Sequence, residues 1–332
     1  MGSSVLRISP QQPLRSSRNL FLRAVNFQET AEVAAQRAVA DLSSSPSILA
    51  KHTLRWMGTR FDVLRAAEYF TQLQSLPLLA MPWWLEESIR GTVDPGFQAD
   101  LMYSTINFYY FTRILDDAMD GHAIEPAVLP AMHFFHSRFV RPYFRYFGLE
   151  SQFWGHFDRL PAMTVEAAAA ESTLHEFSAE EFLTISARKA AGGVLPLAAV
   201  CVRYDRTDLL GQWESMFGMF CRWHQMRDDF LDWNEDAKAG SASWLLTEAK
   251  QRAHAGESVA AWMGREGLAW VRSIMKAWMD ETVAAAAGLH CEKLMTYLGQ
   301  RDEEFTRLID RTIHVAEAFR GLLGVGVASR SA

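Results

Sequence analysis

Apolar residues recur at spacings of three and four along most of the chain from about residue 29 onward, whereas alternating apolar and polar positions, typical of strands, are scarce. The residues that dominate these segments are Ala, Leu, Met, Glu, Arg and Gln, which favour helices. Glycine and proline interrupt the pattern, and the segments between them are mostly about 15 to 25 residues long. The pattern predicts an all-α fold built as a single bundle of long, mostly antiparallel helices.

The start of the chain differs in character. Residues 1–28 carry four arginines and several serines before the first acidic residue, a composition faintly like that of an organelle transit peptide. The segment lacks a clear amphipathic stripe, so a disordered tail is the favoured interpretation. We therefore predict a tail over residues 1–28 and one helical domain over residues 29–325.

The composition and net charge indicate which kinds of partner the protein can bind. The 332 residues are 49% hydrophobic and 22% charged, which is typical of a globular protein with a sizeable core. The net charge of −6 is the opposite of what nucleic acid or an anionic membrane surface would attract. A polyanionic ligand would therefore need metal ions as mediators.

Membrane and redox signals are weak. The longest charge-free apolar run, Ala190 to Val202, falls short of the roughly 20 residues that span a bilayer, so no transmembrane segment is expected. The three cysteines, Cys201, Cys221 and Cys291, are widely separated and lack metal-ligand spacing. Reduced thiols in a cytoplasmic protein are the expected arrangement.

A strongly apolar stretch that begins at Ile106 ends in three acidic residues. On a helix, Asp116 and Asp120 lie one turn apart on the same face with Asp117 beside them, so their carboxylates can converge on a shared cation. Three like charges beside buried aromatic residues repel one another and lose hydration, a conflict that a divalent metal ion resolves. A solvated helix end is the alternative, although the helix dipole disfavours acids at a C-terminus.

The same spacing recurs about a third of the chain later. Another apolar stretch leads into Asp228, Asp229 and Asp232. Magnesium takes oxygen ligands, usually one or two carboxylates together with phosphate oxygens and waters, so two facing acidic clusters can hold a diphosphate through bridging ions. The repeated pattern favours this interpretation over two charged helix surfaces.

A basic pair lies between the clusters. Arg188 could grip diphosphate oxygens with its fork of donors, and Lys189 could do so as a point charge. The following Gly192, Gly193 and Pro196 predict a break in the helix. A surface basic pair next to a close helix crossing is the alternative. Around the second cluster, Arg227 and Lys238 are weaker candidates for contacting the same anion.

At these motifs the sequence resembles the class I isoprenoid synthases, over roughly residues 60 to 320. Asp116, Asp117 and Asp120 match the first aspartate-rich motif of that family, and the stretch from Gln225 to Asp232 is similar to the second motif of prenyl diphosphate synthases. The resemblance implies helices around a central cavity, three Mg²⁺ ions with Mn²⁺ as an alternative, and an allylic isoprenoid diphosphate substrate. It adds Gln225 to the candidate diphosphate contacts and matches Lys189 to a diphosphate-contacting lysine.

The departures from the family pattern are informative as well. Chain-elongating synthases carry an arginine pair after their first motif, whereas residues 121–128 here contain no cation. Their early Gly-Gly-Lys-x-x-Arg-Pro element is also missing. The resemblance thus implies a cyclase that acts on one allylic diphosphate, with farnesyl diphosphate preferred and a homodimer left open. The alternatives are a prenyl diphosphate synthase, a squalene/phytoene-type synthase, and a non-catalytic helical partner of such an enzyme.

In that interpretation, aromatic and polar residues one to two turns from the clusters would shape the cavity, because aromatic faces attract cations and carry no basic atom. The candidates are Phe108, Tyr109 and Thr112 near the first cluster, and Phe217, Phe220 and His224 near the second. Packing in the core is the simpler role for each of them.

Overall fold

The computed structural model describes residues 26–59, 65–119 and 124–328, with side chains described up to residue 318. Within these ranges the regular elements are helices and none is a strand, which confirms the all-α prediction. The long helices are α2 (Phe27–Ser43), α3 (Ser47–Gly58), α5 (Ala80–Arg90), α6 (Pro95–Met119), α7 (Ala131–Val140), α8 (Phe153–Glu171), α9 (Ala179–Lys189), α10 (Leu195–Arg203), α11 (Leu210–Ala239), α12 (Trp244–Arg252), α14 (Leu268–Ala287) and α15 (Glu292–Ala328). Shorter turns of helix are α4 (Ala66–Thr71), α13 (Val259–Trp262), η2 (Pro126–Val128), η3 (Tyr143–Arg145), η4 (Ala191–Val194), η5 (Thr207–Leu209) and η6 (Met263–Gly267).

Helix α6 separates two apolar clusters and is buried on both of its sides. One face supplies Phe97, Leu101 and Phe108 to the larger cluster, which contains residues of α5, α8 to α11, α14 and α15. Another face supplies Met102 and Ile106 to a smaller cluster with α2, α3, α4 and α7. A helix that is apolar almost all round is a core helix. Asp116 and Asp117 therefore lie near the end of a helix that is largely buried.

Local sequence signals set the ends of the helices that carry the site. Helix α9 begins with a capping box, in which Ser178 and Glu181 satisfy each other's backbone N–H groups. Helix α11 runs without interruption through the second acidic cluster and ends where Gly240 adopts φ +73°, a left-handed conformation that glycine adopts without strain. The predicted tail lies mostly outside the described residues, and α2 already begins at Phe27, capped by Asn26.

The predicted break after the basic pair is present. Helix α9 ends at Lys189, the short η4 follows, and α10 starts with Pro196 in its first turn. A Cβ atom at Gly192 would overlap the ring of Phe108 on α6. The glycine therefore permits the close approach of α6 to this break, which corresponds to the close crossing considered as the alternative.

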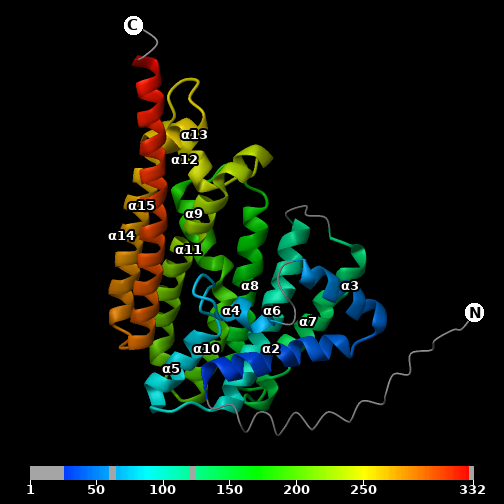
Figure 1. Ribbon diagram of the computed structural model, residues 1–332. Coiled ribbons are helices and arrows are strands. Elements are labelled where there is room, and N and C mark those ends of the chain that lie inside the picture. The colour runs from blue at the N-terminus through cyan, green and yellow to red at the C-terminus, as the bar shows by residue number, and fades with distance from the viewer. Residues whose placement is uncertain (1–25, 60–64, 120–123, 329–332) are drawn as a thin grey trace, which may run out of the picture.

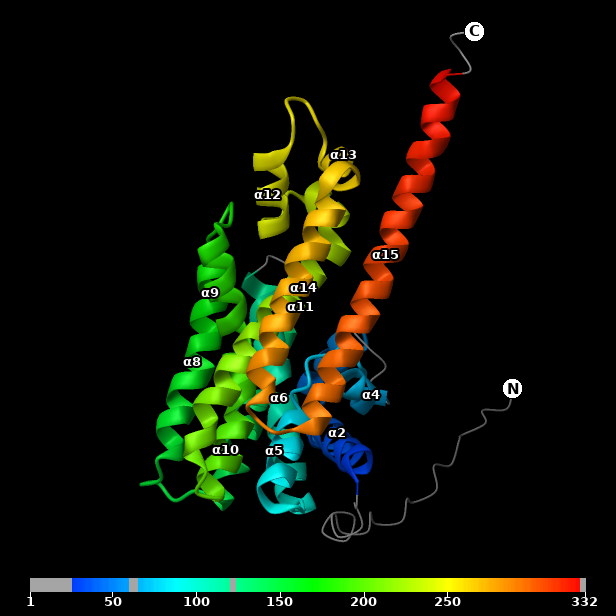
Figure 2. The same cartoon turned by 90° about the vertical axis from the view of Figure 1, so that its left-hand side faces the viewer.

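The helices are arranged as Figures 1 and 2 show. Helix α11 packs against α14 and α9, while α6 packs against α7 and α2. Helices α14 and α15 run side by side along the bundle. All three cysteines are free and buried. No single helix in the described ranges is long and apolar enough to cross a membrane, and α9 with residues 191–203 passes that test only as a pair bent by 42°.

Candidate active site

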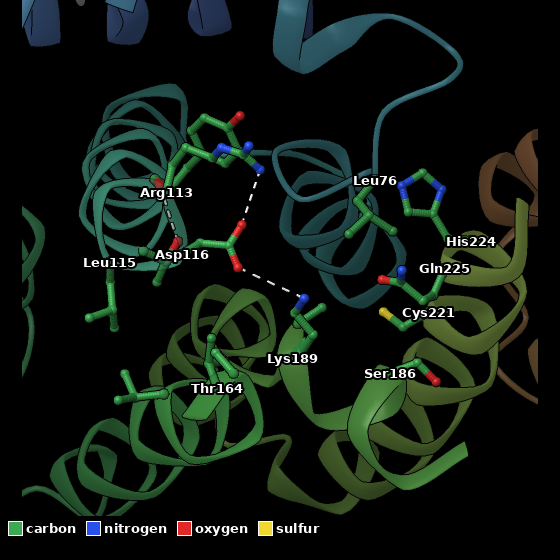
Figure 3. A pocket seen from close by; sticks show the side chains of 15 residues that line it. Leu76, Arg113, Leu115, Asp116, Thr164, Ser186, Lys189, Cys221, His224 and Gln225 are labelled. Atoms are coloured by element: carbon green, nitrogen blue, oxygen red, sulfur yellow. Dashed lines mark hydrogen bonds and ion pairs between the residues drawn. The ribbon is translucent and has the colours of Figure 1, made fainter. Parts of the chain in front are cut away.

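A cavity of about 250 Å³ opens between α6, α8, α9 and α11, and we call it the first cavity (Figure 3). Helix α6 contributes Asp116 to its lining, α9 contributes Lys189, and α11 contributes His224 and Gln225. Its remaining lining is Leu76, Tyr109, Thr112, Arg113, Leu115, Thr164, Val165, Ala168, Ser186, Ala190 and Cys221. Residues from both helices that carry aspartate clusters therefore meet at one cavity.

Asp116 lies between two cations at the edge of the first cavity. Its Oδ2 is 3.1 Å from Nη1 of Arg113, and its Oδ1 is 3.9 Å from Nζ of Lys189 (Figure 3). The side chain is one quarter exposed. A carboxylate in this position can bind a metal ion, either beside Arg113 and Lys189 or in their place.

Asp117 is placed differently, and this departs from the predicted convergence of all three acids. Its side chain is fully buried, where Oδ2 accepts a hydrogen bond of 3.1 Å from the Trp56 indole of α3 and Oδ1 lies 3.0 Å from Nη2 of Arg113. Successive residues of a helix point about 100° apart, so neighbours cannot share one narrow face. Asp117 thus connects α6 to α3. Asp120 lies outside the described residues.

A second cavity, of about 400 Å³, adjoins the first and shares Lys189 and Gln225 with it. Three acidic residues line it, Glu171, Asp229 and Asp236. The rest of its lining is Ser172, Leu174, Phe177, Phe182, Ser241, Ala242, Ser243 and Trp244. The two cavities together bring Asp116 and Asp229, one from each aspartate cluster, to the same part of the bundle.

Asp229 is the buried acid of the second cluster. Burial raises its pKa to about 7; the amide of Gln225, which donates 2.9 Å to Oδ1, opposes this shift, and the carboxylate of Glu171 adds to it. Asp236 acts in the same direction as Glu171. A buried carboxyl group beside other acids is under electrostatic stress that a divalent cation relieves.

The other members of the second cluster are more open. Asp228 is 43% exposed, with Oδ1 accepting 2.9 Å from Nη1 of Arg227 and Oδ2 facing Nε2 of His224 at 3.5 Å. Asp232 is exposed on the following turn, and Lys238 is exposed near the end of α11. The two cavities described above are lined by none of four predicted residues, Arg227, Asp228, Asp232 and Lys238.

The two residues of the basic pair, Arg188 and Lys189, lie in different surroundings. Lys189 forms ion pairs with Glu171 and with Asp116, so its ammonium group lies where the two cavities meet. Arg188 is exposed and lines a separate hollow beside Glu214 and Arg222. The helical turn between adjacent residues explains why only one of them faces the acids. The structure therefore does not bring Arg188 to the predicted diphosphate position.

Three of the six predicted cavity residues line the first cavity, and the other three do not. Tyr109, Thr112 and His224 line the first cavity. Phe108, Phe217 and Phe220 are buried in the larger apolar cluster, where their rings fill space between helices. The burial of these three phenylalanines agrees with the packing role considered as the simpler alternative.

Several site residues were not anticipated from sequence. Arg113 pairs with both Asp116 and Asp117, and its position one helical turn before them was the available signal. Glu171 lies at the end of α8 and Arg301 lies on α15. Both are far along the chain from the aspartate clusters, so no spacing pattern connected them to the site. Burial, together with the cations Arg301 and Arg227, lowers the pKa of His224 to about 3. The imidazole is therefore neutral.

The residues present fit magnesium by their chemistry. The two cavities offer carboxylate oxygens, which are the hard ligands that this ion takes, and Asp229 is buried close enough to Glu171 and Asp236 to be perturbed by their charge. In the part of the chain that the structure describes, no group of three or more His, Cys, Asp or Glu side chains is gathered as a complete metal site. Magnesium usually completes its shell with phosphate oxygens and waters, so one or two carboxylates a side suffice.

The sequence matches no protein-family model and no curated protein.

Proposed function

We propose that this protein is a class I terpene synthase that ionises farnesyl diphosphate with the help of Mg²⁺ and cyclises the resulting cation to a hydrocarbon or alcohol. The observation that carries the proposal is the meeting of the two aspartate-rich helices at one pair of cavities, with Lys189 and Gln225 shared between them. Asp116 of α6 lines the first cavity, and Asp229 of α11 lines the second. This is the arrangement that a metal-bound diphosphate requires.

The charge balance of the two cavities favours one diphosphate over two. The basic side chains among the residues that line them are Arg113 and Lys189. Arg113 is already paired with two carboxylates, Asp116 and Asp117. A chain-elongating synthase must hold a second, non-allylic diphosphate as well. The described lining supports a single anionic head group, and this supports cyclisation over condensation.

Each residue at the site has a task in this reaction. Asp116, Asp229 and Asp236 would hold the Mg²⁺ ions, which neutralise the diphosphate and act as a Lewis acid toward its leaving oxygen. Lys189 would exchange its partners Asp116 and Glu171 for diphosphate oxygens as the acids turn to the metal. Gln225 keeps Asp229 in place through its amide donor. The apolar part of the lining, including Leu76, excludes water from the cation.

The size of the cavities supports a substrate of modest length. Pockets for small ligands span roughly 300–1,000 Å³. The first cavity, at about 250 Å³, and the second, at about 400 Å³, lie at or below the lower part of that range. Phe108 and Phe217 are packed in the larger apolar cluster and line neither cavity, so they add no room to either. A fifteen-carbon chain therefore fits the proposal better than longer ones.

Incubation with farnesyl diphosphate and Mg²⁺ as the sole additions tests the proposal. A fifteen-carbon product in gas chromatography with mass detection is the expected result. A longer prenyl diphosphate formed only when isopentenyl diphosphate is added would favour a chain-elongating enzyme. A thirty-carbon product would favour a head-to-head synthase, and no turnover under any of these conditions would favour a non-catalytic partner.

A further inference from the structure

Residues 72–79 connect α4 to α5, and one side chain of this segment, Leu76, lines the first cavity. Figure 3 shows Arg113 and Asp116 on one side of the cavity, and Leu76 with Cys221 on the other. The proposed diphosphate and its metal ions belong beside the charged residues, so the prenyl chain is left the uncharged side. Leu76 is therefore placed to contact the apolar part of the substrate.

The segment is fixed at one end by a close contact with η4. A Cβ atom at Gly193 would lie 2.5 Å from Cδ2 of Leu78, closer than two carbon atoms can approach, so the glycine admits the Leu78 side chain. Gly193 also lies beside the ring of Phe217, which is roughly three helical turns before Asp229 on α11. Leu78, two residues after Leu76, thus holds the segment against the interior of the bundle.

Helix α15 holds the other end of the same segment. The hydroxyl of Tyr297 donates 2.8 Å to the backbone carbonyl of Ser75, and Nη1 of Arg301 donates 2.7 Å to that of Leu73. Tyr297 and Arg301 are four residues apart, so they share one face of α15, and both side chains are buried. A buried carbonyl that loses its donor is costly, so these bonds keep the backbone before Leu76 in one position.

We propose that Leu76 is a specificity-determining residue that limits the size of the prenyl chain accepted by the first cavity, and that Tyr297 is a positioning residue that holds Leu76 in the lining. The inference rests on the proposed function, because it assigns a prenyl chain to this cavity. It gives a part in substrate selection to the connection between α4 and α5, which lies outside both aspartate-rich helices. Tyr297 itself lines neither cavity, so its effect passes through the segment.

The expected effect follows from the small size of the cavity. At about 250 Å³, the first cavity gains a substantial share of its space when the isopropyl group of Leu76 is removed. An apolar pocket distinguishes ligands that differ by one methylene by about 10- to 200-fold. Leu76→Ala should therefore reduce the preference for a fifteen-carbon over a twenty-carbon chain on the order of 10-fold, and the larger side chain of Leu76→Phe should increase it.

Calorimetry with farnesyl thiodiphosphate and geranylgeranyl thiodiphosphate in the presence of Mg²⁺ measures this preference as the ratio of two affinities, without any turnover being needed. Leu73→Ala is the matched control, since Leu73 is a half-buried leucine of the same segment that lines neither cavity. Its ratio should equal that of the wild type. An unchanged ratio in both Leu76 variants, or an equal change in Leu73→Ala, overturns the inference.

Tyr297→Phe tests the positioning role, because it removes the hydroxyl bonded to Ser75 and leaves the ring in place. The affinity ratio should change in the same direction as in Leu76→Ala, by a smaller factor. Tyr103→Phe is the control for lost stability alone: it removes a buried hydroxyl that donates to Asp41 in the smaller apolar cluster. This control should lower the melting temperature and keep the ratio of the wild type. A wild-type ratio in Tyr297→Phe contradicts the positioning role.

The same titrations separate failure of the inference from failure of the proposed function. If the wild type does not bind farnesyl thiodiphosphate with Mg²⁺, the proposed function is contradicted and the inference falls with it. If the wild type binds this analogue and the Leu76 variants keep its affinity ratio, the proposed function stands and the inference alone is overturned.

Discussion

The buried acid of the second cluster provides the most quantitative prediction. Asp229→Asn keeps the shape of the side chain, and its amide oxygen can still accept from Gln225. Folding raises the pKa of Asp229 from 3.8 to about 7. Because folding raises the pKa, the protonated form favours the folded state. Its contribution is fully present below pH 3.8 and is lost as the pH rises through about 7.

The difference between these two pKa values is about three pH units, and each unit corresponds to about 1.36 kcal/mol. The ionised carboxylate thus lowers the free energy of unfolding by about 4 kcal/mol at pH 8 when no metal is bound. The variant has no such charge. We therefore expect metal-free Asp229→Asn to be more stable than the wild type by about this amount at pH 8, and equally stable at pH 3.5 if both remain folded there.

Urea unfolding in the presence of a chelator, followed by circular dichroism at several pH values, gives the difference directly. Asp232→Asn is the matched control on the same helix, since that acid is exposed and its replacement should leave the unfolding midpoint unchanged. Addition of Mg²⁺ and inorganic diphosphate should stabilise the wild type and not Asp229→Asn. A variant that is equally or less stable than the wild type at pH 8 would refute the reasoning.

Three further predictions concern neighbouring residues. Lys189→Gln should weaken binding of inorganic diphosphate roughly 10- to 100-fold in calorimetry, because a charge-assisted contact is lost, whereas Arg188→Gln should leave it unchanged. Asp117→Asn should lower the free energy of unfolding in urea by about 1–3 kcal/mol, because a buried ion pair is lost. Asp116→Asn should abolish product formation and leave the melting temperature within a few degrees. A destabilised Asp116→Asn together with an Asp117→Asn of unchanged stability would contradict the geometry. Gly192→Ala should cost about 1–3 kcal/mol through overpacking against an aromatic ring, and an unchanged melting temperature would refute the close approach seen here.

The helical character of the chain was readable from the sequence because periodic apolar residues and glycine or proline breaks are local signals. The break at Gly192 and the capping box at Ser178 depend on a few neighbouring residues. The aspartate clusters were also readable, since their spacing repeats. What spacing cannot give is the direction in which adjacent residues of a helix point once the helix is packed.

For this reason the sequence alone could not show that Asp116 and Asp117, or Lys189 and Arg188, point in different directions. Packing of α6 between two apolar clusters fixes its rotation, so that one acid lines the first cavity and its neighbour is buried against α3. Arg301 could not be recognised for a different reason. An arginine in a polar-looking stretch of a C-terminal helix is usually exposed, and only the tertiary fold shows that it is buried behind His224.

Release of inorganic diphosphate from farnesyl diphosphate, measured with wild type, Asp116→Asn and Asp229→Asn at saturating Mg²⁺, tests most directly whether the two aspartate-rich helices act together on one substrate. The wild type should release one diphosphate for each fifteen-carbon product without isopentenyl diphosphate. Each single variant should lose most of this activity, because each removes a proposed metal-holding carboxylate from a different cavity. Release that persists in either variant, or that requires isopentenyl diphosphate in the wild type, would contradict the account.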